Sequence, residues 1–460
     1  MTDDAAPETT TDPAHAHVQD FIEFIQASPS SFHAAEEVAR RLEAAGAARV
    51  DERDPFPTAP GTYVLVREGA AVAWHLPSDG AGAAGERAGD AAADKRAGET
   101  AHDPGERGFR IIGSHTDSPG FRLKPNPQAE SGGYIRAEVE IYGGPLVNAW
   151  LDREIEFAGV VATHDGRTHL ARTGPVARVP QLAIHLNREI NSEGLKLHRQ
   201  EHTHPVVGLG GDIREVLAAA AGVDEADVAA WDLISFDTQP PRVFGMAGEF
   251  LACGRLDNLL SVHSSLVALE AAMARWNAEG DGDLGGDIPV LIAFDHEEVG
   301  SASPTGAAGP LLADMLERIA ASVGADGEAR HRMLRRSVCV SADGAHAVHP
   351  NHTGEHDPGH RPQLNVGPVI KVNANQRYAT DAWGQAFIAG LAERAGVPSQ
   401  VFVSANHKPC GSTIGPITAT RLGIRTIDVG APMLSMHSPR EMTGAADPWL
   451  LTAVLAEFWR

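Results

Sequence analysis

Two adjacent glutamates at the end of an apolar run have the residue types and the placement expected of a catalytic site. Residues 288–294, Ile-Pro-Val-Leu-Ile-Ala-Phe, predict a buried strand, and Glu297 and Glu298 follow where that strand becomes a loop. In an open α/β sheet, ligands bind at the carboxyl ends of the strands. Because neighbouring side chains of an extended segment point to opposite sides, one glutamate can hold a metal while the other faces a substrate. A double glutamate alone is usually a solvated loop, so the interpretation depends on the other residues that accompany it.

Other acidic and imidazole side chains also follow predicted strands or begin predicted helices. They are His115 and Asp117 after residues 109–113, Asp257 at the start of residues 256–276, Asp343 after residues 337–341, and His437 after residues 424–429. Oxygen and nitrogen donors without thiolate suit zinc, manganese or cobalt in a site with open positions. Taken singly, Asp257 has the ordinary alternative of a helix cap and Asp343 that of a turn residue. Their joint occurrence at strand ends is what indicates a metal site.

The number of candidate ligands favours two metal ions over one. A single catalytic zinc needs three protein ligands, whereas the sequence offers five. These are His115, Asp257, Glu298, Asp343 and His437. Five ligands with one shared carboxylate fit a pair of ions about 3.5–4 Å apart. Asp117 can then accept the second ring N–H of His115 and fix its tautomer, and Glu297 is left as general base for a water molecule.

Composition excludes several classes of partner. The formal net charge of −23 disfavours binding to nucleic acid or to an anionic membrane. No apolar run approaches the length of about 18 residues needed to span a bilayer, and residues 1–13 lack a basic region and an apolar signal core. The three cysteines, Cys253, Cys339 and Cys410, are widely spaced and odd in number, which fits a reducing compartment. We therefore expect a soluble, cytoplasmic protein.

The order of predicted elements suggests an α/β domain that is interrupted by a β-rich module. Helical apolar spacing occurs at residues 18–26, 33–45, 256–276, 311–322, 381–395, 411–422 and 447–459, and strand-like runs at 63–67, 71–75, 109–113, 288–294, 337–341, 366–372, 400–404 and 424–429. Pro29 separates the first two helices, and Ser30 or Ser31 is placed to cap the second. From residue 121 to about residue 242 the sequence instead shows short β-like runs separated by Gly, Pro and Asn.

The predicted fold class is therefore α/β, with a mixed-sheet catalytic domain flanked by helices and an inserted β-rich domain. The chain of 460 residues is long enough for both. We assign residues 1–118 and 247–460 to the catalytic domain and 119–246 to the insert. Residues 78–107 contain no aromatic residue and no aliphatic residue larger than alanine, which predicts a disordered surface loop. The histidines between 349 and 360, in a Gly/Pro-rich stretch, predict a solvated loop.

Several short motifs resemble those of the aspartyl aminopeptidase family of metallopeptidases, peptidase family M18. The matching segments are residues 113–119 (Gly-Ser-His-Thr-Asp-Ser-Pro), 254–258 (Gly-Arg-Leu-Asp-Asn), 294–300 (Phe-Asp-His-Glu-Glu-Val-Gly), 341–346 (Ser-Ala-Asp-Gly-Ala-His), 371–378 (Lys-Val-Asn-Ala-Asn-Gln-Arg-Tyr), 410–416 (Cys-Gly-Ser-Thr-Ile-Gly-Pro) and 436–438 (Met-His-Ser). The resemblance runs from near residue 18 to the C-terminus with the motifs in the family's order, and the combination is highly specific.

The resemblance implies a two-zinc aminopeptidase that removes N-terminal Asp or Glu from peptides, while the donor types leave Mn or Co possible. One ion would be held by His115, Asp257 and Asp343, and the other by Asp257 as a bridge, Glu298 and His437. Glu297 would be the base, and Asp117 would support the metal ligands from behind. The resemblance also implies that the insert is a dimerisation domain and that the homo-oligomer is a dodecamer built from dimers.

The resemblance also implies a substrate-binding role for three further residues. His185 is similar to a histidine that family members supply to the neighbouring subunit's active site, although from sequence alone it would be a core or edge-strand histidine. Lys371 is similar to a lysine associated with recognition of acidic side chains, and Tyr378 lies in the same segment. The chain departs from its relatives at His407-Lys408, where an acidic or small polar residue is common, and in the length of residues 78–107. The first departure bears on side-chain preference.

Two alternatives remain open at this point. The same metal architecture serves neutral-residue aminopeptidases and N-acyl amino acid deacylases. A non-catalytic metal-binding scaffold belongs to a different class, and Glu297 speaks against it because a purely structural site needs no spare base. Helix N-terminal amides at residues 411–413 are a further candidate for orienting the substrate.

Overall fold

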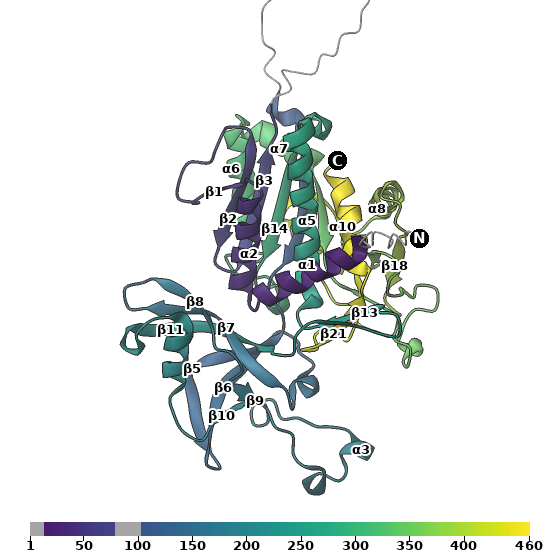
Figure 1. The fold of residues 1–460 in the computed structure, drawn as a ribbon. Helices are drawn as coiled ribbons and strands as arrows, with labels where there is room; N and C mark the ends of the chain where they lie inside the picture. The colour runs from purple at the N-terminus through teal and green to yellow at the C-terminus, as the bar shows by residue number, and fades with distance from the viewer. Residues whose placement is uncertain (1–12, 79–102) are drawn as a thin grey trace, which may run out of the picture.

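The computed structural model describes residues 13–78 and 103–460. A nine-stranded sheet with helices on both faces forms one part of the molecule, and a smaller β barrel lies beside it (Figure 1). The predicted fold class, a mixed-sheet α/β domain with an inserted β-rich domain, is confirmed. No helix among the described residues is both long enough and apolar enough to cross a bilayer.

The large sheet is mixed and has a parallel centre. Its strands, in spatial order, are β1 (Ala48–Arg49), β2 (Gly61–Arg67), β3 (Ala70–Leu76), β14 (Ile288–Phe294), β4 (Phe109–His115), β15 (Val338–Ala342), β19 (Arg425–Gly430), β17 (Val369–Val372) and β18 (Gln400–Val403). The neighbours β14, β4, β15 and β19 run parallel, whereas β3 and β17 are antiparallel to their neighbours β14 and β19. The carboxyl ends of the four central strands therefore share one edge of the sheet.

Helices cover both faces, which explains why the central strands are apolar along their whole length. One face packs against α1 (Pro13–Ala27), α2 (Ser31–Ala44), α5 (Leu256–Glu279), α8 (Ala382–Arg394) and α10 (Asp447–Phe458), and the other against α6 (Leu311–Ser322), α7 (Gly327–Arg336) and α9 (Ile414–Leu422). Within β14, Leu291 and Ala293 belong to the first core, and Val290 and Ile292 to the second. This alternation is the two-residue period of a strand.

The inserted module closes into a barrel. Its strands, in order, are β11 (Val228–Asp237), β5 (Gly120–Ser131), β6 (Tyr134–Tyr142), β10 (Val206–Gly208), β9 (Ala177–Arg178), β7 (Glu154–Thr163) and β8 (Thr168–Arg172). The additional pairing of β11 with β7 closes the ring. Helix α4 (Ile213–Ala221) contributes Leu217 and Ala218 to the barrel core, and a long loop that contains α3 (Ile190–Glu193) projects from it (Figure 1).

A third, five-stranded sheet joins parts of the chain that the sequence pattern leaves separate. It contains β12 (Arg242–Phe244), β13 (Phe250–Cys253), β21 (Glu441–Gly444), β20 (Pro432–Leu434) and β16 (Ala345–His346). None of these strands was predicted, because each is at most four residues long and too short to show alternation. This sheet ties the start of α5 to the loop that carries His437.

Most predicted elements match the structure to within a few residues, and the exceptions have local causes. Ser30 is the N-cap of α2, where its side chain accepts a hydrogen bond from the amide of His33. Helix α9 begins at Ile414 with Thr413 as its cap, so the prediction of helical amides at residues 411–413 was wrong. Helix α7 was missed because its exposed face is densely charged and leaves few apolar positions to show the period.

The predicted disordered loop at residues 78–107 mostly falls on residues 79–102, which lie outside the described residues. Its two ends belong to the folded structure. Ser78 donates hydrogen bonds to Asp281 through its amide and its hydroxyl. At the other end Asp103 caps a short helix at Pro104–Glu106 and pairs with Arg332 of α7. For residues 103–107 the prediction of disorder was therefore wrong.

Candidate metal centre

Three of the predicted site segments arrive together because their strands are neighbours. His115 is the last residue of β4, Glu297 and Glu298 lie in a single helical turn just after β14, and Asp343 follows β15. Since β14, β4 and β15 are adjacent and parallel, their carboxyl ends deliver these side chains to one edge of the sheet.

The five-stranded sheet brings the two remaining donors, and a buried glutamate joins them. Asp257 lies at the start of α5 just beyond β13, and His437 lies between β20 and β21. The Glu441 carboxylate accepts the amide of Asp257 at 3.0 Å and the amide of His437 at 2.7 Å. The hydroxyl of Ser118 also donates to the Asp257 carbonyl at 2.7 Å. Glu441 thus fixes the backbone of both donors with one side chain.

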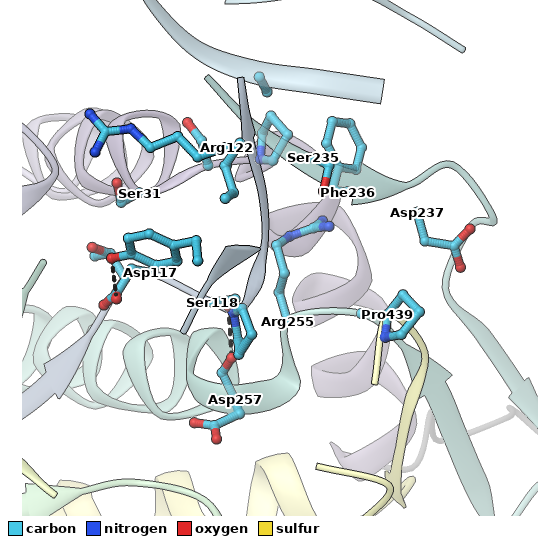
Figure 2. Close-up of a pocket in the computed structure, with 18 of the residues that line it drawn as sticks. Ser31, Asp117, Ser118, Arg122, Ser235, Phe236, Asp237, Arg255, Asp257 and Pro439 are labelled. Carbon is cyan, nitrogen blue, oxygen red and sulfur yellow. Dashed lines mark hydrogen bonds between the residues drawn. The ribbon is translucent and has the colours of Figure 1, made fainter. Parts of the chain in front are cut away.

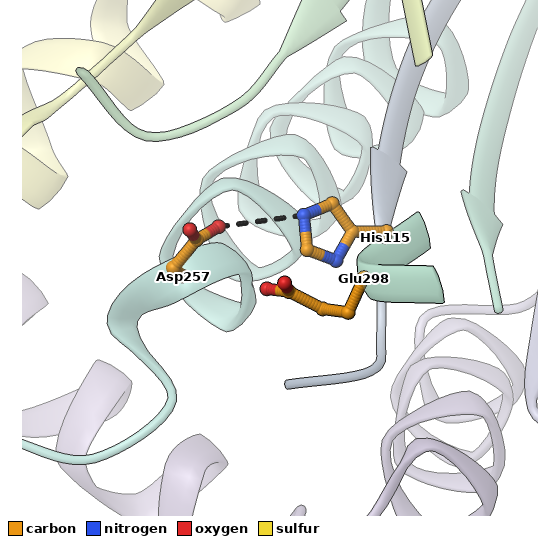
Figure 3. Close-up of side chains that lie close together, drawn as sticks. All are labelled: His115, Asp257 and Glu298. Carbon is orange, nitrogen blue, oxygen red and sulfur yellow. Dashed lines mark ion pairs between the residues drawn. The ribbon is translucent and has the colours of Figure 1, made fainter. Parts of the chain in front are cut away.

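Asp257 lies between the two imidazoles and offers one oxygen to each. Its Oδ1 is 3.3 Å from Nε2 of His115, and its Oδ2 is 3.3 Å from Nε2 of His437. Asp343 Oδ2 stands 3.6 Å from the same His115 nitrogen, and Glu298 Oε2 stands 3.4 Å from the His437 nitrogen. The structure therefore places the donors in two groups that share Asp257. Figure 3 shows His115, Asp257 and Glu298, whose ligand atoms all lie within 4.8 Å of one another.

Backbone carbonyls fix the tautomer of both imidazoles. Nδ1 of His115 is 3.0 Å from the carbonyl of Asp117, and Nδ1 of His437 is 3.1 Å from the carbonyl of Gly144. A carbonyl only accepts, so each Nδ1 carries a proton, and each Nε2 is the nitrogen that faces the carboxylates and could bind a metal once it is deprotonated. For His115 this partner is the backbone of Asp117 and not its carboxylate, whose nearer oxygen is 3.4 Å away.

The Asp117 carboxylate instead holds the double-glutamate turn. Its Oδ1 accepts the amide of Glu297 at 3.0 Å, and its Oδ2 accepts the amide of Glu298 at 3.1 Å. Oδ2 also accepts the hydroxyl of Tyr142, which belongs to the barrel, at 2.8 Å. Asp117 therefore acts on the position of both glutamates.

The pKa shifts in the cluster indicate an excess of negative charge that bound cations would neutralise. Burial and the charge of Asp257 raise the pKa of Glu441 to about 8, and burial with Asp343 and Asp257 raises that of Glu297 to about 8. For His437, burial lowers the pKa, but Asp257 and Glu298 outweigh it and raise the value to about 10. Acidic side chains thus exceed the basic groups available to neutralise them.

Two carboxylate oxygens show this excess of negative charge directly. Asp257 Oδ1, which lies 3.3 Å from His115 Nε2, and Glu298 Oε1 are buried and have no hydrogen-bond partner among the described residues. Buried carboxylate oxygens without a partner are costly unless they bind a metal. The donor set of imidazole nitrogens and carboxylate oxygens matches zinc, so the residues fit the metal that the sequence motifs imply.

The three predicted substrate residues have different surroundings. Lys371 is only 1% exposed, and its Nζ donates to Asp343 Oδ1 at 2.9 Å and to the Gly344 carbonyl at 3.1 Å. Tyr378 is buried with its ring centroid 5.1 Å from that ammonium. Both line the cavity of about 390 Å³ at the centre. His185 does not line it and lies exposed on the projecting loop of the barrel.

A second cavity lies behind the centre, between the barrel and the large sheet, and it shares Asp117 and Asp257 with the site (Figure 2). Arg255, across this cavity, projects toward Phe236 of the barrel, with its guanidinium carbon 5.0 Å from the ring centroid. Its position shows that the rear of the centre is built from both domains.

Several residues at the site were missed from the sequence. Glu441 could have been found from the sequence, because it is an acidic residue only four positions after the predicted ligand His437. Ser118 directly follows Asp117. Tyr142 and Gly144 had no signal, since nothing local indicates that this part of the β-rich insert lies against the metal centre.

The fold and the site define a metal-dependent hydrolase, and comparison with known proteins gives its family. The model of the family described as aminopeptidase I zinc metalloprotease (M18) matches residues 100–459. This chain belongs to that family and is a zinc metalloaminopeptidase. It is 46% identical over 448 residues to a probable M18 family aminopeptidase 2 of Streptomyces avermitilis, with 96% of this chain and 97% of the relative covered.

Solved structures agree with this assignment. A chain in the cryo-EM structure of the Ape4 and Nbr1 complex is 33% identical with a TM-score of 0.87, covering 98% of this chain and 87% of that chain. A chain of the S. cerevesiae mApe1 dodecamer is 26% identical with a TM-score of 0.80, and 97% of each chain is covered.

Replacement of Glu441 tests whether this residue positions the metal donors. We expect Glu441→Ala to weaken zinc binding about 10–100-fold, as is typical for partners that orient ligands, because the backbones of Asp257 and His437 both lose their acceptor. Zinc affinity measured by competition with a chromophoric chelator checks this, with exposed Glu130→Ala as control. Equal affinities in the two variants would contradict the role.

Proton release provides a second test of the centre. The raised pKa values of Glu441, Glu297 and His437 mean that these groups carry protons near pH 7. These values describe the metal-free centre. Zinc would displace the proton of His437, a proposed ligand, and its charge would lower the pKa of the neighbouring Glu441 and Glu297, so its apparent affinity should rise with pH between about 6 and 9. Calorimetric titration in buffers of different ionisation enthalpy measures the proton count. Binding that releases no proton at pH 7 would refute this account of the site.

Proposed function

We propose that this metalloaminopeptidase removes single N-terminal residues, with Asp or Glu preferred, by means of two zinc ions and Glu297 as general base. The observation that carries the proposal is the position of Asp257, which directs one oxygen to the His115 group and the other to the His437 group. A carboxylate shared in this way is what a two-metal site requires.

The proposed ligands are His115, Asp343 and Asp257 for one ion, and Asp257, Glu298 and His437 for the other. Zinc bound there would polarise the scissile carbonyl and lower the pKa of the attacking water. Manganese or cobalt would also suit these donors. The unpartnered oxygens of Asp257 and Glu298 support the assignment.

Glu297 is the member of the double-glutamate pair that is left free to move a proton. Its Oε2 is 3.9 Å from Nε2 of His115, and its side chain is 15% exposed. Glu298 is more deeply enclosed, with a side-chain exposure of 4%. In the proposed reaction Glu297 takes a proton from the attacking water and delivers it to the nitrogen of the leaving amine. Asp117 supports this role by fixing the amide of Glu297.

The proposed acidic preference draws support from the cavities rather than from Lys371 alone. The cavity at the centre shares His346, Tyr378 and Gly411 with a neighbouring cavity that Lys408 also lines. Lys371 already donates to Asp343, so it is committed to that carboxylate. Within residues 13–78 and 103–460, the ion-pair partner of Lys408 is the half-exposed Glu355. A substrate carboxylate can compete for Lys408 by the same kind of interaction.

The proposal extends to domains and assembly. We propose residues 1–118 and 247–460 as the catalytic domain and 119–246 as a dimerisation domain, within a cytoplasmic homo-oligomer that is a dodecamer built from dimers. The solved structure of mApe1, to which this chain is similar, is a dodecamer. Around His185, Leu182, Ile184 and Leu186 are 59%, 49% and 74% exposed, and such an apolar patch is typical of an interface. This loop would carry His185 to the active site of a neighbouring subunit.

Replacement of the base tests the catalytic assignment. Glu297→Gln should abolish turnover, with a loss of at least about 100-fold as expected for removal of general base catalysis, because the amide cannot accept the proton. Zinc content should stay at the wild-type level, since Glu297 is not a proposed ligand. Peptide hydrolysis and metal analysis of the same preparation check both. Retained activity would remove Glu297 from the mechanism.

Replacement of Lys408 tests the substrate class. Lys408→Gln should lower kcat/KM about tenfold for Glu- and Asp-terminal peptides, the order of effect of one hydrogen-bonded charge pair, and should leave Leu-terminal peptides unchanged. Glu355→Gln, which frees Lys408, should raise the acidic preference. Equal effects on Glu- and Leu-terminal peptides would contradict a specificity role. N-acetyl amino acids in the panel, assayed before and after chelation and zinc restoration, test the deacylase alternative.

A further inference from the structure

The end of strand β6 is linked to the double-glutamate turn through Asp117, which one side chain of the strand contacts. The Tyr142 hydroxyl donates to Asp117 Oδ2 at 2.8 Å, and the two oxygens of Asp117 receive the amides of Glu297 and Glu298. Burial, with the charges of Asp117 and Asp295, raises the pKa of Tyr142, so the phenol keeps its proton. A single hydroxyl of the barrel therefore anchors the carboxylate that holds the double-glutamate turn.

The same segment also holds the opposite group of donors. The Gly144 carbonyl accepts Nδ1–H of His437 at 3.1 Å, and the amide of Leu146 donates to the His437 carbonyl at 2.9 Å. His437 has a φ of +69°, a region that non-glycine residues adopt only where their surroundings hold them. The barrel backbone thus fixes both the ring and the main chain of His437.

Gly143, between these two contacts, allows the close approach. It has a φ of +68°, and a Cβ at this position would lie 3.1 Å from Cβ of Glu298 and 3.5 Å from its Oε2. Any side chain here would both strain the backbone and push against Glu298. The glycine is therefore required by the contact between barrel and centre.

We propose that residues 142–144 of the barrel form a positioning element of the catalytic centre. Tyr142 fixes the Glu297–Glu298 turn through Asp117, and the Gly144 carbonyl fixes the imidazole of His437. The barrel is then part of the active site of its own chain, in addition to any role in assembly. The inference rests on the proposed roles of Glu297, Glu298 and His437, but it is independent of the acidic preference.

Removal of one oxygen tests the Tyr142 contact. Tyr142→Phe should lower kcat about tenfold, the order of effect of one hydrogen bond to a carboxylate, with KM changed less than about twofold because substrate contacts are retained. The matched control is Tyr134→Phe, on the first residue of the same strand, where the ring is 49% exposed. Rates are taken on whichever aminoacyl peptide the wild type cleaves fastest, so a wrong side-chain preference does not affect the result.

Two glycine variants separate positioning from general backbone strain. Gly143→Ala should reduce kcat by a larger factor than Tyr142→Phe. Gly132→Ala lies in the turn between β5 and β6. Gly132 has a similar φ of +61°, and apart from its chain neighbours the nearest described atom to an added carbon is Cδ2 of Tyr134 at 4.0 Å. Both variants should lower the unfolding temperature to a similar extent, and only Gly143→Ala should lower kcat and weaken zinc retention during dialysis against a chelator.

The outcomes decide the proposal in either direction. A Tyr142→Phe enzyme with kcat within about twofold of wild type would overturn the role of Tyr142. An equal loss of kcat in Gly132→Ala and Gly143→Ala would show that strain alone is responsible and would also overturn it. If Gly143→Ala fails to fold, Tyr142→Phe still decides, because it removes a single oxygen and keeps the buried ring.

Discussion

The arrangement of the whole centre depends on one constraint, the placement of a buried carboxylate between two imidazoles. Asp257 directs an oxygen to each of His115 and His437 at 3.3 Å. Buried charges cost several kcal/mol unless they are paired or bound to a metal, so this aspartate can lie here only if the surrounding groups and cations compensate it. Each of the three sheets helps to position the groups that surround Asp257.

The sheets contribute through their edges. The parallel neighbours β14, β4 and β15 deliver Glu298, His115 and Asp343 to the sheet edge where Asp257 lies, because parallel strands end together. The five-stranded sheet brings His437 beside Glu298, and Glu441 accepts the amides of both Asp257 and His437. The proposed metal site is therefore a junction between two sheets, and neither sheet holds the complete donor set.

The barrel adds a third set of contacts that a purely assembling domain would not need. The Tyr142 hydroxyl and the Gly144 carbonyl reach Asp117 and His437 at 2.8 and 3.1 Å. Hydrogen bonds of this kind hold catalytic groups within the narrow range of geometry that turnover requires. The position of the barrel and the geometry of the centre are consequently coupled, and the exposed loop that carries His185 belongs to the same domain.

Local patterns in the sequence determined the main strands and helices, the cap at Ser30 and the places where chemistry-bearing residues leave their strands, because alternation and helical period act over a few residues. They did not determine which strands are neighbours. The burial of Lys371 against Asp343, the backbone partner of His115 and the contact of Tyr142 with Asp117 were decided only by the tertiary structure. Each joins residues that are brought together by sheet order and domain packing, and the physical reason is that such contacts leave no period or spacing along the chain.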